Sequence, residues 1–138
     1  MLTKRIINTD RVRKIARGFS FIPHRFLADG FLTFLDREEI LLYLFLVLAG
    51  DRYGLSCYSY DAICTLMQLT LDEYIAARDG LIEKNLISFD GRIFQVLSLP
   101  PRPTVKPKLA YDEDEDPALT MQIIRRSLRD ADQRRALP

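Results

Sequence analysis

Several residue types are scarce in this chain of 138 residues, and each scarcity excludes a class of site. The chain has no tryptophan, two cysteines and a single histidine, His24. Cys57 and Cys64 lie seven residues apart, which is neither a CxxC motif nor the spacing of zinc ligands. Two cysteines cannot form a disulfide framework, so we expect both thiols to be reduced and partly buried in a cytosolic protein.

Long apolar segments are also missing from the chain. The basic N-terminus is not followed by the apolar stretch that a secretory signal peptide needs. The longest apolar run covers residues 40–50, whereas a membrane-spanning helix needs roughly 20 residues. Because this run follows an acidic helix start and ends at Gly50, we predict a buried core helix and no membrane association.

Patterns typical of catalysis are equally scarce. We find no Ser-His or Cys-His arrangement, no glycine-rich phosphate loop and no cluster of metal ligands. His24 follows a proline among apolar residues, which favours a structural or surface role over that of a general base. Asp36, Glu38 and Glu39 are typical of a helix start rather than of a catalytic pair. The sequence therefore predicts a protein that is not an enzyme and that uses no metal, cofactor or small-molecule substrate.

Charge is distributed unevenly along a chain whose formal net charge is only +1. Residues 1–25 carry seven Lys or Arg and one Asp, whereas residues 26–100 carry five basic residues against eleven acids. Residues 101–138 are nearly balanced, with eight basic and seven acidic residues. A basic arm of net +6 thus precedes an acidic core of net −6, and this asymmetry indicates a polyanionic partner for the arm.

Capping and turn residues divide the apolar part of the chain into elements. We predict short helices over residues 9–17 and 24–29, a strand over 55–58, and longer helices over 37–49, 59–68 and 70–84. The predicted N-caps are Thr9, Asp36, Ser59 and Thr70, and Glu39 completes a capping box with Asp36. A hairpin over residues 86–97 follows, because Asp90-Gly91 is a strong turn signal. The positions expected to be buried are Ile63, Leu66, Met67, Tyr74, Ala77 and Leu81.

Proline and charge divide the chain into four regions. Residues 1–18 form the basic arm, residues 19–99 the folded domain, residues 100–117 a linker, and residues 118–138 a C-terminal amphipathic helix. The linker is first proline-rich and then acidic over residues 112–116. The predicted fold class is therefore mainly α with a small β-hairpin, an α+β domain flanked by an arm and a helix.

Residues 36–97 resemble a winged helix-turn-helix domain. The segment YDAICTLMQLT at residues 60–70 matches the helix, turn and cap, and Tyr74, Ala77, Leu81 and Asn85-Leu86-Ile87 match the helix that enters the wing. A glycine is usual where Asn85 stands, and both residue types tolerate left-handed backbone. The lead-in FIPHRFL at residues 21–27 is similar to plasmid and phage replication initiators and to small proteins of bacterial mobile elements. The resemblance implies a replication, transcription or mobile-element system, and it is more specific for fold than for function.

In such domains the helix at residues 70–84 would enter the major groove of DNA. Its exposed positions are predicted to be Leu71, Asp72, Glu73, Ile75, Ala76 and Asp79. None of them is Arg, Lys, Asn or Gln, the types that most often contact base edges, and the three acids would repel phosphates. We therefore expect Leu71, Ile75 and Ile82 to dock a protein partner or a second copy instead. The alternative that they are ordinary scattered surface residues stays open.

Basic residues outside that helix are better candidates for nucleic-acid contacts, which would be directed mainly at phosphates. The candidates are Lys4, Arg5, Arg11, Arg13, Lys14 and Arg17 in the arm, Arg92 in the wing, and Arg125, Arg126 and Arg129 near the C-terminus. A solvated tail is the alternative for the arm. The acidic run at residues 112–116 is either a solvated linker or a segment that competes with nucleic acid for the arm.

Two functional hypotheses follow from these patterns. The preferred one is a non-enzymatic protein that binds nucleic acid through arm and tail, in a dimer or larger assembly. The alternative is an adaptor or oligomerisation module that docks a partner protein through the helix at residues 70–84 without reading DNA.

Overall fold

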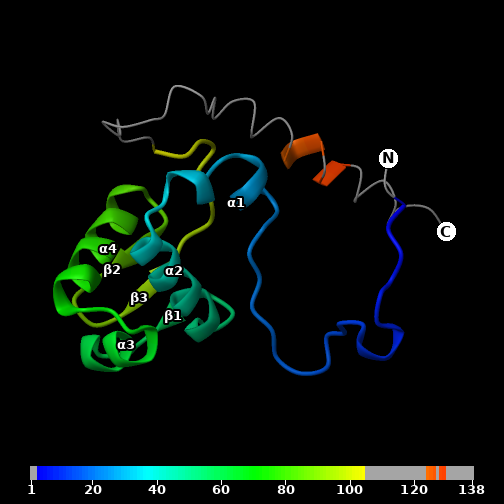
Figure 1. Cartoon of the computed structure of the whole chain (residues 1–138). Helices are drawn as coiled ribbons and strands as arrows, with labels where there is room; N and C mark the ends of the chain where they lie inside the picture. The colour runs from blue at the N-terminus through cyan, green and yellow to red at the C-terminus, as the bar shows by residue number, and fades with distance from the viewer. Residues whose placement is uncertain (1–2, 105–123, 127, 130–138) are drawn as a thin grey trace.

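The computed structural model describes residues 3–104, 124–126 and 128–129. The elements run in the order η1 (Thr9–Arg11), α1 (Arg25–Ala28), η2 (Leu32–Phe34), α2 (Arg37–Ala49), β1 (Leu55–Ser56), α3 (Tyr60–Met67), α4 (Leu71–Glu83), β2 (Ile87–Phe89) and β3 (Phe94–Val96), where η marks a 3-10 turn. Figure 1 shows the helices packed with the small sheet, and the N-terminal arm leaving them at α1. The fold is mixed α+β, as the sequence predicts.

The central helix α2 begins and ends where the sequence predicts. Asp36 and Glu39 form the reciprocal capping box at its start. Leu42, Tyr43 and Leu46 form its buried face, and α2 packs against α4 and α3. The expectation that the whole run would be buried is wrong for one face, on which Leu41, Leu44 and Leu48 are exposed. Among the described residues, no helix combines the length and apolar character that a membrane span requires.

Helices α3 and α4 also follow their sequence signals. The Ser59 hydroxyl accepts a hydrogen bond from Ala62 N, and the Thr70 hydroxyl accepts one from Glu73 N, so both predicted N-caps are confirmed. The predicted burial is confirmed at four of the six expected positions: Ile63, Tyr74, Ala77 and Leu81. Met67 is only half-buried. The prediction is wrong for Leu66, which is exposed because it faces outward from α3.

The three strands form one antiparallel sheet in the order β1-β3-β2. The predicted hairpin is confirmed, with Ile87 opposite Val96 and Phe89 opposite Phe94. At its turn the Asp90 carboxylate accepts hydrogen bonds from the backbone of residues 92 and 93, and Gly91 has a φ of 100°. The predicted strand at residues 55–58 is shorter than expected, because only two residues of β1 pair with β3.

Two residues other than glycine end helices in left-handed backbone. Asn85 has a φ of 59°, as the resemblance to the wing entry implies, and Gln68 has a φ of 57° at the end of α3. Non-glycine residues in this region cost roughly 1–2 kcal/mol, and asparagine tolerates it better than glutamine.

We expect Gln68→Gly to raise the free energy of unfolding in urea by roughly 0.5–1 kcal/mol, less than the full strain because glycine also loosens the unfolded chain. Asn85→Gly should gain less, and an equal or larger gain at Asn85 would contradict this explanation.

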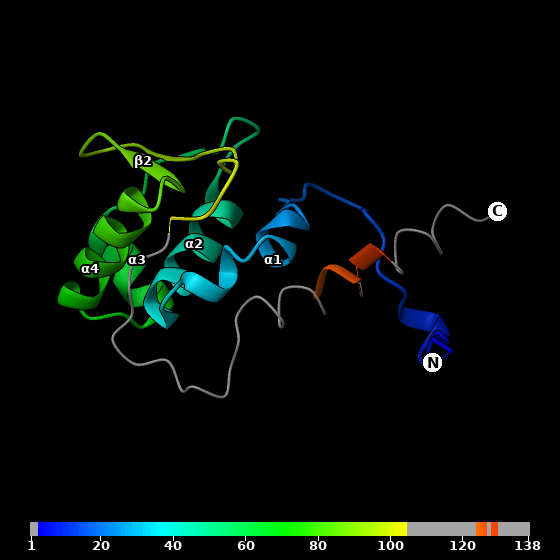
Figure 2. The same ribbon diagram turned by 90° about the horizontal axis from the view of Figure 1, so that it is seen from above.

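The N-terminal arm is not the helix that the sequence predicts over residues 9–17. Only the 3-10 turn η1 forms there, and Asn8, rather than Thr9, caps it by accepting a hydrogen bond from Asp10 N at 3.1 Å. Every described residue before Phe26 is exposed. The arm therefore lacks the apolar contacts that a helix this short needs for stability. Figure 2 shows the arm beyond α1, on the side of the molecule away from α4.

Two segments after the sheet return to α1. Arg25 donates a hydrogen bond to Pro100 O at 2.8 Å, which holds the chain that leaves β3. Residues 124–126 and 128–129 are helical, and Arg125 donates to Ala28 O at 2.8 Å. The rest of the predicted C-terminal helix, the linker beyond residue 104 and its acidic run lie outside the described residues.

Candidate nucleic-acid interface and docking faces

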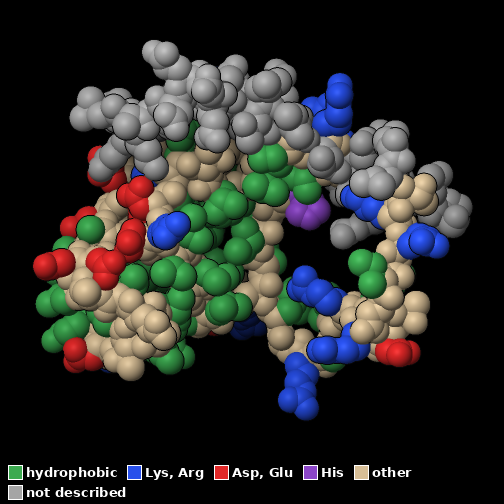
Figure 3. Space-filling model, viewed as in Figure 1, with side chains coloured by type: hydrophobic (Ala, Val, Ile, Leu, Met, Phe, Trp, Pro, Cys, Tyr) green, Lys and Arg blue, Asp and Glu red, His purple; other side chains and the backbone are tan. Residues whose placement is uncertain are grey.

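The arm carries the largest group of predicted nucleic-acid contacts. Its six cations are all exposed, and they precede the folded elements that begin at α1: Lys4, Arg5, Arg11, Arg13, Lys14 and Arg17. Figure 3 shows basic side chains along the arm and acidic side chains gathered on the α4 side of the core. The charge asymmetry of the sequence is therefore also a spatial separation, with the positive part projecting into solvent.

Helix α4 presents three faces with different chemistry. Tyr74, Ala77 and Leu81 are buried against the core. A second face carries acids: Asp72 and Asp79 are exposed on it, roughly 140–160° around the helix from Ala77 at the centre of the buried face. Hydrogen bonds from the backbone and hydroxyl of Thr70 hold the pKa of Glu73 below its usual value, so this carboxylate is ionised at neutral pH. The face would repel phosphate, and the absence of α4 from a groove stays a prediction.

The third face of α4 brings together the predicted docking residues. Leu71, Ile75 and Ile82 are exposed and recur at helical spacing on one side, four and seven residues apart. Arg78 lies between them in this row, with its guanidinium over the rings of Tyr74 and Phe89. The result is a narrow apolar stripe interrupted by one half-buried cation.

An acidic cleft of about 300 Å³ separates the start of α2 from α4. Six carboxylates line it: Asp36, Glu38, Glu39, Glu73, Asp79 and Glu83. At its floor the carboxylate of Glu39 accepts from Lys84 Nζ at 2.7 Å and from Asp36 N at 2.8 Å, and Lys84 also donates to Phe34 O. Both side chains of this ion pair are almost completely buried. The second oxygen of Glu39 has no hydrogen-bond partner.

Local sequence patterns do not predict this buried pair. The sequence predicts Glu39 only as a capping residue, and Lys84 stands at a helix end, where exposed lysines are common. Gly80 was the available signal, because glycine inside a helix costs stability unless another group approaches closely. A Cβ at Gly80 would overlap the second carboxylate oxygen of Glu39.

The β2–β3 hairpin contributes one cation beside one anion. Arg92 is exposed at the tip of the β2–β3 hairpin, directly after Asp90-Gly91. Hydrogen bonds from the backbone of Ile93 and Arg92 hold the pKa of Asp90 below its usual value. The tip is therefore electrically balanced at neutral pH, and Arg92 alone adds little attraction for phosphate.

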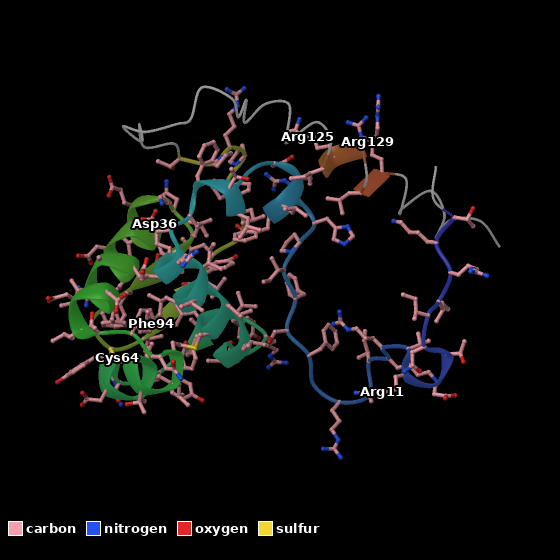
Figure 4. The ribbon with its side chains drawn as sticks, in the orientation of Figure 1. Arg11, Asp36, Cys64, Phe94, Arg125 and Arg129 are labelled. Atoms are coloured by element: carbon pink, nitrogen blue, oxygen red, sulfur yellow. The ribbon has the colours of Figure 1, made fainter. Side chains whose placement is uncertain are left out.

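The C-terminal arginines lie apart from the cations of the arm. Figure 4 shows Arg125 and Arg129 beside α1 and Arg11 on the distant bend of the arm. Arg125 contacts Asp29 at 3.3 Å, and Asp29 also pairs with Arg25 at 2.8 Å. Arg126 and Arg129 are exposed. The structure thus assigns Arg125 a contact within the chain and leaves the other two accessible.

The described residues also bear on the remaining sequence predictions. Cys64 is half-buried and Cys57 exposed, so the expectation of partial burial is wrong for Cys57, which directly follows the edge strand β1. His24 is exposed. Within the described ranges, no three His, Cys, Asp or Glu residues gather as a metal site would require.

Comparison with known proteins adds no assignment: no protein-family model, curated protein or solved structure matches the chain significantly.

Proposed function

We propose that this protein binds nucleic acid through phosphate contacts made by its N-terminal arm. The observation that carries the proposal is the placement of six exposed cations on a segment outside an acidic core. Phosphates attract such a segment without sequence preference, and release of their counterions supplies the free energy. Arg126 and Arg129 are secondary candidates for the same interaction.

The arrangement of elements supports a winged helix-turn-helix as the scaffold for the arm. The order α2-β1-α3-α4-β2-β3 with a sheet ordered β1-β3-β2 fits that architecture. Many proteins of this fold bind DNA with the helix that corresponds to α4. Here the acidic face of α4 argues for a different surface, and we assign the contact to the arm. A role in replication, transcription or a mobile element rests on the resemblance of the sequence alone.

The arm hypothesis predicts strongly salt-dependent binding. Fluorescence anisotropy with a random DNA duplex compares the full chain with a variant lacking residues 1–17. If six cations contact phosphates, the affinity of the full chain should fall roughly 10³-fold between about 50 and 200 mM salt. The variant should lose most of this affinity and most of its salt dependence. Arg92→Gln is the matched control. It should reduce the slope of log affinity against log salt concentration by at most about one, the share of a single phosphate contact.

A second pair of substitutions locates α4 relative to the nucleic acid. Asp72→Ala and Asp79→Ala remove two exposed charges without disturbing the Thr70–Glu73 cap. If α4 lay in a groove, removing them would strengthen binding by relieving repulsion. The arm hypothesis expects an unchanged affinity.

Absence of binding by the full chain at about 50 mM salt would exclude the proposal, because electrostatic binding is strongest there.

The competing function is an adaptor that docks a protein through α4. The observation in its favour is the common face of Leu71, Ile75 and Ile82. Ile75→Asp would abolish partner binding on this hypothesis and leave nucleic-acid affinity unchanged. An adaptor without nucleic-acid affinity would show no salt-dependent binding in the anisotropy experiment.

A further inference from the structure

The outward face of α2 is an apolar surface without a cover among the described residues. Leu41, Leu44 and Leu48 are 37%, 42% and 65% exposed, and they follow one another along about two turns of α2. A helix that is apolar on all sides is normally buried on all sides. The ring of Tyr58 meets Phe45 edge-on at 5.2 Å, which extends the apolar surface beyond the helix. We call these five residues the α2 patch.

A second apolar surface lies in the segment that joins the arm to α1, close to the core. Phe19 and Phe21 are 68% and 74% exposed, in a stretch without helix or strand. In extended backbone, alternate side chains point to the same side and recur at roughly 6.6 Å. Residues four apart on a helix recur at roughly 6 Å along its axis. Extended backbone at residues 19–21 would therefore place the two phenylalanines at the spacing of Leu44 and Leu48.

We propose that Phe19 and Phe21 of one copy of this chain pack on the α2 patch of a second copy, and that the reciprocal contact closes a symmetric dimer. A single repeated contact then covers both apolar surfaces that the described residues of each chain leave exposed. Four phenylalanines that bury about 150 Å² each, with a similar area from the facing residues, give a total near 1,200 Å². This total reaches the lower end of the area that specific interfaces bury.

Charge favours a second copy of this chain as the occupant. The arm and the rest of residues 1–25 have a net charge of +6, and residues 26–100 have a net charge of −6. An arm that reaches a neighbouring core therefore meets the opposite net charge, which steers the encounter. Any other protein that bound the α2 patch in this way would need aromatic residues next to basic ones, a combination that residues 1–25 of this chain already supply.

The short tether between arm and core favours exchange over folding back. Phe26 N donates to Pro23 O at 3.0 Å, so the first helical turn starts at Pro23. Only Ile22 separates this turn from Phe21. Phe26 stacks on Tyr43 at 4.8 Å between ring centroids, and Tyr43 lies 100–160° around α2 from the three leucines. Short hinges of this kind promote the exchange of segments between copies.

The dimer does not depend on nucleic-acid binding. The cations from Lys4 to Arg17 precede the aromatic segment, so they stay available for phosphates when Phe19 and Phe21 are covered. Removal of residues 1–17 tests the nucleic-acid proposal while leaving both phenylalanines in place. The two proposals can therefore fail separately.

Sedimentation velocity of the full chain and its variants, without nucleic acid, tests the dimer. We expect wild type to dimerise, and both Phe19→Ser/Phe21→Ser and Leu44→Ser/Leu48→Ser to weaken dimerisation at least tenfold. Leu66→Ser is the matched control, because Leu66 is 62% exposed on α3, outside the patch, and should leave the dimer unchanged. Circular dichroism melting shows whether each variant still folds.

Mixing the two double variants distinguishes arm exchange from direct pairing of two α2 helices. The Phe variant keeps an intact α2 patch and the Leu variant keeps an intact arm. Exchange therefore predicts that the mixture forms heterodimers with one intact contact, weaker than wild type but stronger than either variant alone. A monomeric wild type at about 100 µM, or dimers that persist in the Phe variant, would overturn the proposal.

Discussion

Replacing Lys84 with methionine is expected to lower the free energy of unfolding by about 3–5 kcal/mol, the usual cost of leaving a buried charge without its partner. Lys84 Nζ donates to Glu39 and to Phe34 O, and the Glu39 side chain is only 4% exposed. The substitution leaves a carboxylate in the interior with one remaining donor, Asp36 N. Urea unfolding monitored by circular dichroism measures the loss.

A second substitution separates the charge effect from lost packing. Glu39→Gln keeps an oxygen that can accept from Asp36 N while removing the charge. When it is added to the Lys84→Met chain, it should therefore recover part of the stability that Lys84→Met loses. If Lys84→Met acted only through lost packing, the stability losses of the two single variants would add in the double variant. Asp79→Asn breaks the exposed pair with Arg78 and provides the control, which should change stability by less than about 1 kcal/mol.

Gly80→Ala is expected to destabilise the protein by roughly 1–3 kcal/mol, the range typical of overpacking. The same change in an exposed helix interior would instead stabilise by about 1 kcal/mol, because alanine has the higher helix propensity. The difference arises from Glu39, whose Cδ would lie 3.0 Å from the new Cβ and whose second oxygen would lie closer still. Urea unfolding therefore tests whether Gly80→Ala lowers or raises the free energy of unfolding.

Two comparisons make the Gly80 result specific. Ala76 is exposed one turn earlier on α4, so Ala76→Gly should cost about 1 kcal/mol through helix propensity alone. In a chain that carries Glu39→Ala and Lys84→Met, the obstructing carboxylate is absent, and Gly80→Ala should become stabilising. A stabilising Gly80→Ala in the wild-type chain would contradict the close approach of α2 and α4.

Local signals in the sequence were sufficient to predict the main elements. Asp36, Ser59 and Thr70 have side chains that satisfy the first free N–H groups of a helix, and each starts one. Asp90-Gly91 supplies the carboxylate and the positive φ that its turn needs. These interactions span three or four residues, so their effect is almost independent of the rest of the fold.

Predictions failed where a residue's state depends on distant contacts. The apolar spacing of residues 9–17 suits a helix, but none of these residues is buried against the part of the chain that the structure describes, and only η1 forms. The run at residues 40–50 is apolar throughout, yet only packing against α3 and α4 decides which of its faces is covered. The sequence likewise predicted Leu66 to be buried, and α3 turns it outward.

The sequence by itself determined the helix starts, the hairpin turn and the separation of a basic arm from an acidic core, because these properties are set by neighbouring residues and by composition. Only the tertiary structure joined Glu39 to Lys84 across 45 positions, explained Gly80 and left Leu44 and Leu48 open to solvent. Such contacts depend on how α2 and α4 meet, and no local pattern encodes that geometry. The charge of the arm was therefore visible in the sequence, whereas the surface proposed to receive its phenylalanines became visible only in the fold.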